Sequence, residues 1–279
     1  MKFDRFSPIG IFDSGVGGLS VLQHIRQTLP HEALLYFADS GFAPYGDKAE
    51  SVIIERSLAV ADYLIAHHIK ALVVACNTAT AAAIKVLRQR YPDLILIGME
   101  PGLKPAALHS HSKIVGVLAT QATVLSEKFL LLRAQLETAR GVQFIPQACT
   151  GLVDQIEKGE LASAATLALV RRYVAPLLAQ GADTLVLGCT HYPFVAHLIR
   201  QVCADCGQPN TQLIDTGAAV ALHLQRLLTQ AQLLRPAITP APPPSLRATT
   251  TGSASSLQQA LLRLLKIGDC EVLALAAVA

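Results

Sequence analysis

Two short stretches decide the fold: ALVVACNTAT at residues 71–80 and TLVLGCTHYP at residues 184–193. In each, an aliphatic run too short for a helix and bounded by small residues predicts a buried parallel strand, which delivers Cys76 or Cys189 to its carboxyl end. Small polar residues and a helical pattern follow. We therefore expect each thiol just before a helix N-terminus, where unpaired backbone N–H groups favour an anion. Our central hypothesis is that both thiols face one pocket.

The same pattern of strand, loop and helix recurs elsewhere in the chain. PIGIF (8–12) ends on a glycine-rich loop that begins with Asp13 and Ser14, and LLYFA (34–38) ends at Asp39. Because functional residues of α/β folds gather at the carboxyl ends of strands, we expect these polar residues beside Cys76. The loop glycines fit neither the dinucleotide fingerprint nor a phosphate loop, and a tight turn explains them equally well.

Periodicity and breaker residues place the remaining elements. An irregular loop carrying Tyr45 follows the second strand, because Pro44 and Gly46 interrupt any regular pattern. We expect strands at 94–98, 114–119, 143–146 and 212–217 and near 275, helices at 48–69, 79–90, 161–180 and 255–265, and an extended linker at the five prolines between 235 and 245.

An internal repeat determines the expected domain organisation. IVGVLA (114–119) followed by TQAT echoes the first strand and its loop, and a cysteine strand follows in both halves. The sequence therefore predicts an α/β protein with two similar doubly wound domains related by pseudo-two-fold symmetry. The first domain is discontinuous, at 1–99 and 211–279, and the second is at 100–210. The active site is expected in the cleft between them.

Composition narrows the class of protein. Hydrophobic residues make up 52% of the 279 residues, but no apolar run approaches the roughly 18 residues that cross a bilayer, so we expect no membrane association. The N-terminal segment lacks the pattern of a signal peptide, which makes the cytoplasm the expected location. The net charge is only +3, basic residues are scattered and Trp is absent, so we expect no nucleic-acid partner.

The presence of two cysteines in matching positions indicates the type of reaction. A single cysteine with a histidine would suggest a nucleophilic hydrolase. Two matched cysteines, one near Asp13 and the other two residues before His191, favour acid–base chemistry on opposite faces of a substrate. The other four cysteines, Cys149, Cys203, Cys206 and Cys270, are expected to be structural. Cys203 and Cys206 have CxxC spacing, but no second pair follows, so we expect no metal site.

With these residues placed, the sequence closely resembles the glutamate racemases, cofactor-independent enzymes that supply D-glutamate for peptidoglycan. The similarity covers nearly the whole chain and is carried by FDSGVGGLSV (12–21), PYG (44–46), VACNTA (74–79), EPG (100–102) and LGCTHYP (187–193). The resemblance implies that Cys76 acts on the D enantiomer and Cys189 on the L enantiomer, assisted by Asp13 and His191. It also implies that the substrate is held by Asp13, Ser14, Tyr45, Gly46, Asn77, Thr78, Thr190 and His191.

Some positions depart from the family pattern. Thr150 stands where the family commonly has a proline after the cysteine at position 149. The resemblance assigns Asp39 and Glu157 only a supporting role. No lysine lies at an expected strand end, so a pyridoxal Schiff base is not expected, and neither is any other cofactor. A homodimer is compatible with the resemblance. The sequence gives neither the oligomeric state nor an activator.

Alternative functions remain open. Within the same fold group, the protein could instead be an aspartate or hydantoin racemase, or a maleate isomerase in which one cysteine attacks carbon. A different class is a non-catalytic protein that binds amino acids, in which neither cysteine would be needed for activity.

Overall fold

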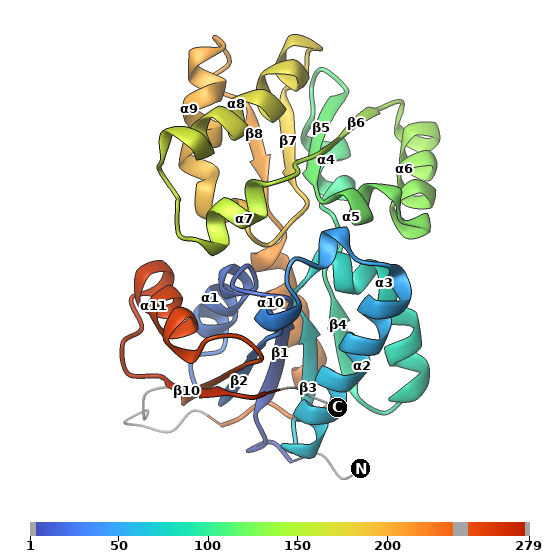
Figure 1. Cartoon of the computed structure of the whole chain (residues 1–279). Helices are drawn as coiled ribbons and strands as arrows, with labels where there is room; N and C mark the ends of the chain where they lie inside the picture. The colour runs from blue at the N-terminus through green and yellow to red at the C-terminus, as the bar shows by residue number, and fades with distance from the viewer. Residues whose placement is uncertain (1–3, 237–244, 277–279) are drawn as a thin grey trace. The chain divides into compact units, whose positions relative to one another are not determined.

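The structure, a computed structural model, describes residues 4–236 and 245–276 of the chain. The chain folds into two compact units, and the second is inserted into the first (Figure 1). Unit 1 comprises Met1–Met99 and Gly217–Ala279, and unit 2 comprises Glu100–Thr216. Both units are α/β structures with parallel sheets, as the alternating strand and helix patterns predict.

Unit 1 is built on a six-stranded sheet in the order β10-β9-β2-β1-β3-β4, with every neighbouring pair parallel. The central strands are apolar at successive positions rather than alternating, because helices cover both faces there. The strands are β1 (Ile9–Asp13), β2 (Leu34–Ala38), β3 (Ala71–Val74), β4 (Ile95–Gly98), β9 (Leu246–Thr250) and β10 (Glu271–Ala274).

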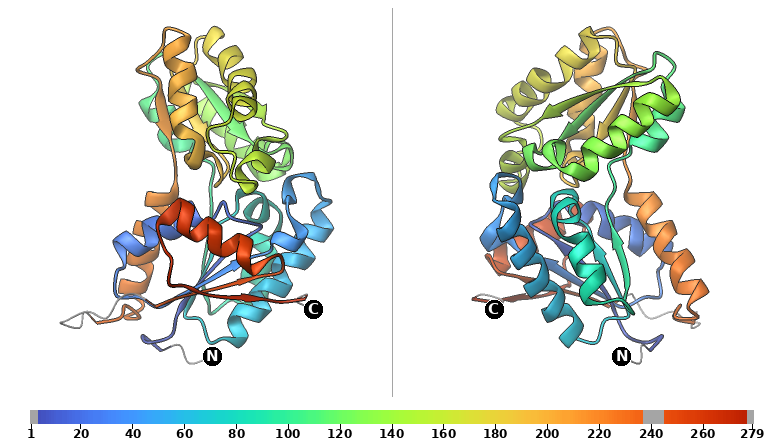
Figure 2. Two further views of the ribbon diagram at one scale, coloured as in Figure 1. Left: turned by 60° about the vertical axis from the view of Figure 1, so that its left-hand side comes forward. Right: turned by 90° about the vertical axis from the view of Figure 1, so that its right-hand side faces the viewer.

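Helices cover the sheet of unit 1 on both faces (Figure 2). On one face α2 and α3 pack together, and their apolar residues join Phe12, Phe37 and Val74 in one core cluster. On the other face α1 packs against α10 and α11. The helices are α1 (Leu19–Thr28), α2 (Glu50–Ala66), α3 (Asn77–Arg90), α10 (Gly217–Gln230) and α11 (Ala254–Leu265), with short 3₁₀ turns η1 (Ser40–Phe42) and η2 (Tyr45–Asp47).

Unit 2 has a four-stranded parallel sheet in the order β6-β5-β7-β8. One core cluster joins the sheet to α7, α8, η3 and α9, and the other joins it to α4, α5 and α6. The strands are β5 (Ile114–Ala119), β6 (Gln143–Ala148), β7 (Thr184–Leu187) and β8 (Gln212–Ile214). The helices are α4 (Leu103–His109), α5 (Gln121–Leu125), α6 (Glu127–Arg140), α7 (Leu152–Glu157), α8 (Ala164–Ala179) and α9 (Ala196–Asp205), with the 3₁₀ turn η3 (Tyr192–Val195).

The second domain boundary differs from the sequence-based one. Residues 211–216 were assigned to the first domain, but β8 pairs with β7 in the sheet of unit 2, with Leu213 opposite Leu185. The reason is apolar burial, because Leu213 and Ile214 pack against the two core clusters of unit 2. The predicted proline-rich linker falls mainly on 237–244, outside the described residues. Among the described residues, no helix combines the length and apolar composition that a membrane crossing requires.

Candidate active site

The first cysteine site lies at the carboxyl edge of the sheet in unit 1. Asp13 is the last residue of β1, Asp39 directly follows β2, and Cys76 lies two residues beyond β3. Because β1 is hydrogen-bonded to both β2 and β3, these three strand ends are neighbours. The amide of Asp39 donates to the carbonyl of Asp13 at 2.9 Å, which extends the register past the strand ends. The structure therefore brings Asp13, Asp39 and Cys76 together as the sequence predicts.

Cys76 is the N-cap residue of α3. Its Sγ accepts a hydrogen bond from the backbone N–H of Ala79 at 3.4 Å and lies 3.7 Å from the hydroxyl of Ser14. The N-terminus of a helix stabilises negative charge, so this position favours the thiolate form. Cys76 therefore has the local environment of a thiol that can accept and return a proton.

Asp13 is fully buried, and its Oδ1 accepts a hydrogen bond from the Gly15 amide at 2.7 Å. The glycine at position 18 makes this arrangement possible, because a Cβ there would lie 2.6 Å from the Asp13 Cβ. The loop glycines thus have at least a packing role. Asp13 is held against the loop that carries Ser14, within the same cluster as Cys76.

Asn77 supplies the clearest sign of a ligand at this site. Its side chain is 5% exposed, and neither Oδ1 nor Nδ2 makes a hydrogen bond to any described residue. A buried amide without partners costs free energy, and buried polar groups in native proteins are nearly always hydrogen-bonded to protein, water or a ligand. Asn77 is adjacent to Cys76 and to Thr78, which is also buried. A polar ligand beside the Cys76 thiol would satisfy this amide.

Tyr45 and Gly46 begin the turn η2, which follows a cis peptide bond between Ala43 and Pro44. The Tyr45 hydroxyl points inward and donates to Asp39 Oδ2 at 2.6 Å. Burial, followed by the nearby Asp39 carboxylate, raises the pKa of Tyr45 far above its usual range, so the hydroxyl remains a donor. What Tyr45 and Gly46 can offer a ligand is therefore their backbone N–H groups.

The second cysteine site lies at the carboxyl edge of the sheet in unit 2. Cys189 lies two residues beyond β7, and its Sγ is 3.6 Å from His191 Nδ1. His191 Nε2 is in turn 2.6 Å from Glu157 Oε1, at the last residue of α7. The structure thus assembles a chain of thiol, imidazole and carboxylate. The sequence predicted the neighbouring His191 and, through the resemblance alone, Glu157.

Hydrogen bonds to Cys189 and Glu157 control the pKa of His191. Burial by itself would lower its pKa, but hydrogen bonds to Cys189 and Glu157 outweigh that effect and hold the pKa well above its usual value. The imidazole therefore keeps its proton to higher pH than an ordinary histidine does. An imidazolium beside a thiol stabilises the thiolate, which is how an adjacent histidine activates a cysteine.

The local backbone at Cys189 differs from the expectation. The sequence predicts a helix directly after this cysteine, but η3 begins at Tyr192 and α9 only at Ala196. Pro193 lies in the 3₁₀ turn, where its missing N–H costs no helical hydrogen bond. His191, rather than a long helix, is therefore the main positive partner of Cys189. Thr190 lies between the two and is buried.

The remaining cysteines do not join either site as reactive groups. Cys149 lies near Cys189 and Tyr192, but burial raises the pKa of its thiol to about 12, so it stays neutral. Cys203 is buried in α9, while Cys206 is exposed at its end. No cluster of three metal-ligating side chains occurs within 4–236 and 245–276.

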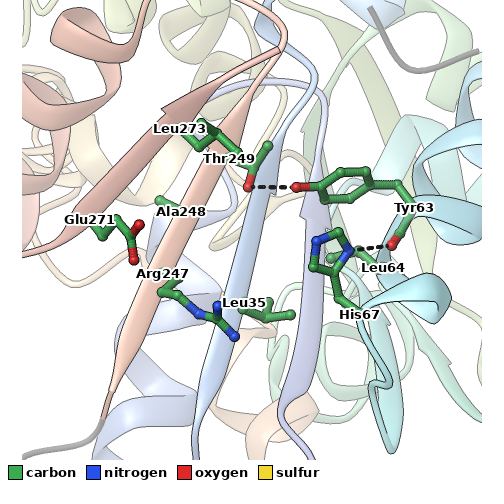
Figure 3. Close-up of a pocket in the computed structure, with 9 residues that line it drawn as sticks. All are labelled: Leu35, Tyr63, Leu64, His67, Arg247, Ala248, Thr249, Glu271 and Leu273. Atoms are coloured by element: carbon green, nitrogen blue, oxygen red, sulfur yellow. Dashed lines mark hydrogen bonds between the residues drawn. The ribbon is translucent and has the colours of Figure 1, made fainter.

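A small cavity of about 80 Å³ opens elsewhere in unit 1, between α2 and the strands β2, β9 and β10 (Figure 3). Tyr63 and His67 lie on one side of it, and the oppositely charged Arg247 and Glu271 lie on the other. None of the predicted site residues lines it. We therefore do not assign the activity to this cavity.

Sequence reasoning missed two residues that the structure connects to the first site. Arg56 and Thr251 both bind the Asp39 carboxylate. A signal for Arg56 was present, because it follows Ile53 and precedes Val60 on the buried stripe of α2, where a charge requires a buried partner. Thr251 follows a strand end, but nothing local links it to Asp39, more than two hundred residues earlier.

Comparisons with known proteins identify the family. The family model described as Asp/Glu/Hydantoin racemase matches residues 9–224. The chain belongs to this family. It is 55% identical over 228 residues to a glutamate racemase of Ectopseudomonas mendocina, covering 82% of this chain and 84% of the relative. The sequence-based recognition of a racemase family is confirmed.

Solved structures of racemases share the fold of this family member. Glutamate racemase isoform RacE1 of Bacillus anthracis superposes with a TM-score of 0.85 at 30% identity, covering 97% of this chain and 98% of that one. Escherichia coli glutamate racemase, solved with L-glutamate and the activator UDP-MurNAc-ala, gives a TM-score of 0.81 at 32% identity, covering 96% and 97% of the two chains. The predicted α/β fold class is confirmed.

Proposed function

We propose that this protein is a glutamate racemase that interconverts L- and D-glutamate without a cofactor, using the thiols of Cys76 and Cys189. The observation that carries the proposal is that each unit places a buried cysteine at the carboxyl edge of its parallel sheet, each with its own polar partners. The relatives named glutamate racemase, and the Escherichia coli neighbour solved with L-glutamate, support the choice of substrate.

The proposed reaction is a pair of proton transfers at the substrate Cα. One cysteine thiolate removes the Cα proton and becomes a thiol, while the other thiol donates its proton to the opposite face and becomes a thiolate. Following the resemblance, Cys76 acts on D-glutamate and Cys189 on L-glutamate. Asp13 assists Cys76. His191, whose pKa is raised by its hydrogen bonds to Cys189 and Glu157, assists Cys189.

The proposed substrate contacts follow from the chemistry of the side chains. Binding requires donors for the carboxylates and an acceptor for the ammonium group of glutamate. The unpartnered Asn77 amide and the N–H groups of Tyr45 and Gly46 are suited to a carboxylate, and Asp13 to the ammonium. Ser14, Thr78, Thr190 and His191 complete the proposed set. Asp39 and Glu157 support this set through their hydrogen bonds to Tyr45 and His191.

The broader setting is also part of the proposal. Both cysteine sites are proposed to act on one substrate in a cleft between two domains related by pseudo-two-fold symmetry. The enzyme would operate in the cytoplasm, supply D-glutamate for peptidoglycan, and assemble as a homodimer. The repeated order of strands, loops and cysteines in the two units supports the single shared site.

Hydrogen exchange at Cα tests the proposal directly. In deuterated buffer, D- or L-glutamate should gain deuterium at Cα and racemise, whereas aspartate should not. Exchange with aspartate and none with glutamate would reject the substrate assignment in favour of another activity of the family.

Substitution of the cysteines tests the mechanism. Cys76→Ala and Cys189→Ala should each reduce racemisation by at least about 10²- to 10⁴-fold, the range attributed to one acid or base. Cys206→Ala changes an exposed cysteine and serves as the matched control with unchanged turnover. If both buried-cysteine variants kept full activity, the two-thiol mechanism would be wrong.

A further inference from the structure

The Asp39 carboxylate is fully engaged by three side chains of unit 1. Its Oδ2 accepts from the Tyr45 hydroxyl at 2.6 Å and from Arg56 Nε at 3.0 Å. Its Oδ1 accepts from Arg56 Nη2 at 3.0 Å and from the Thr251 hydroxyl at 2.8 Å. A carboxylate offers about four acceptor positions, so these four bonds saturate it. Asp39 is therefore suited to hold protein groups in place rather than to bind substrate.

The donors come from three separate parts of unit 1. Tyr45 belongs to the loop of residues 40–47, Arg56 to the second turn of α2, and Thr251 to the segment just after β9. The pair of Arg56 and Asp39 is buried, with side-chain exposures of 9% and 0%. A bidentate, buried pair of this kind fixes geometry more strictly than a single bond at the surface. The cluster thus ties the loop to both α2 and β9.

The loop also contacts the Thr251 segment directly. The Gly41 amide donates to the Thr251 hydroxyl at 3.0 Å, so this hydroxyl accepts from the loop and donates to Asp39. The backbones approach so closely that a Cβ on Gly41 would lie 2.6 Å from the Thr251 carbonyl oxygen. The loop also contacts α2, because the Arg56 guanidinium lies 3.8 Å from the centre of the Phe42 ring.

From this geometry we propose that Thr251 and Arg56 are positioning residues of the active site. Acting through Asp39, they hold the loop of residues 40–47 so that the Tyr45 and Gly46 amides meet the substrate. The inference rests on the proposed racemase function and extends it to residues that contact no substrate. Misplacement of a substrate-binding loop by about 1 Å is enough to cost a large factor in activity.

A matched pair of threonines, Thr249 in β9 and Thr251 just after it, provides the test. Thr251→Val removes the hydroxyl that bonds Asp39 and Gly41 while keeping the shape of the side chain. Thr249→Val makes the same change two residues earlier, where the hydroxyl lies 3.4 Å from the Tyr63 hydroxyl at the small cavity (Figure 3). Thr251→Val should raise KM for D-glutamate about tenfold with kcat changed less than about threefold, because the loop binds substrate. Thr249→Val should leave both constants unchanged.

Two further variants separate positioning from simple stability. Thr251→Ser keeps both hydrogen bonds and should restore KM. Arg56→Lys keeps the charge but loses the bidentate fork, and should raise KM in the same direction even if Thr251→Val fails to fold. An unchanged KM in folded Thr251→Val, or in Arg56→Lys if the valine variant fails to fold, would overturn the inference. So would an equal rise in Thr249→Val. Wild-type protein that exchanges no Cα hydrogen of glutamate would instead refute the proposed function itself.

Discussion

Single side chains set the charge of each cysteine site. At Cys189 one of them is Glu157, which is 24% exposed and, together with Cys189 itself, raises the pKa of the buried His191 imidazole. The raised pKa of His191 means that this pair stabilises the folded state fully below the unfolded histidine value of about 6.5. The contribution is lost as pH rises through the folded pKa. Deprotonation of His191 thus affects both the cysteine site and the stability of the fold.

Removal of the Glu157 charge should shift that titration. Glu157→Gln removes a group that raises the pKa of His191, so the protonated imidazole should be lost at lower pH than in the wild type. The alkaline limb of the kcat/KM profile should move to lower pH. Glu160→Gln, the same change at an exposed position three residues later, should leave the limb in place. An unmoved limb in Glu157→Gln would mean that the carboxylate does not tune His191.

Local sequence motifs made the reactive residues predictable. Partners that are distant in the sequence could not be predicted. Cys76, Asp13 and His191 could be placed because each follows an apolar strand within one or two residues or lies beside such a cysteine. Thr251 could not, because its bond to Asp39 depends on β9 pairing with β2 across most of the chain. Sequence periodicity contains no information about which strand becomes a neighbour at such a separation.

The helices expected from the sequence agree with the structure at α8 and α11, whereas α4 and α10 were missed. The helix expected at 255–265 is α11, one residue longer at its start, and α8 lies within the expected 161–180. By contrast, the sequence predicts no helix at α4, because Pro101, Gly102 and Pro105 interrupt the helical pattern there. Pro105 occupies the first turn, where a helix tolerates it. No element was assigned to α10, an apolar helix that the chain uses to return to unit 1.

The cap of α8 offers a prediction about this helix. Ser163 Oγ accepts from the Thr166 amide at 3.3 Å at the start of the helix that covers one face of the sheet in unit 2. Ser163→Ala should lower the free energy of unfolding by about 1 kcal/mol, as the loss of an N-cap usually does. Ser163→Asp keeps an acceptor and should lose much less. Urea unfolding followed by circular dichroism measures both, and equal losses would argue against a capping role.

A buried ion pair between Lys70 and Glu32 links separate segments of unit 1. Lys70 is fully buried, and its Nζ lies 2.5 Å from Glu32 Oε2. The same ammonium donates to the carbonyls of Arg5 at 2.7 Å and Leu233 at 2.8 Å, so it joins the N-terminal segment to the chain after α10. Burial lowers the pKa of Lys70, although Glu32 opposes this effect.

Breaking this pair should destabilise unit 1 strongly. Lys70→Met leaves the Glu32 carboxylate buried without its cation, which typically costs about 3–5 kcal/mol. The double variant Lys70→Met, Glu32→Gln removes the unpaired charge and should recover part of that loss. Lys85→Met at an exposed position should change stability by less than about 0.5 kcal/mol. Urea unfolding distinguishes the three, and a small loss in Lys70→Met would show that the pair contributes little.

The insertion of unit 2 into unit 1 determines the order in which a growing chain can fold. When residues up to 216 have been synthesised, unit 2 has all four of its strands, whereas unit 1 still lacks β9 and β10. Until then β2, which is buried in the finished sheet, is an open edge that can pair with other chains. The Lys70 and Asp39 clusters also wait for Leu233 and Thr251. The unit that begins first is therefore completed last, and β2 lacks its β9 neighbour for most of the synthesis.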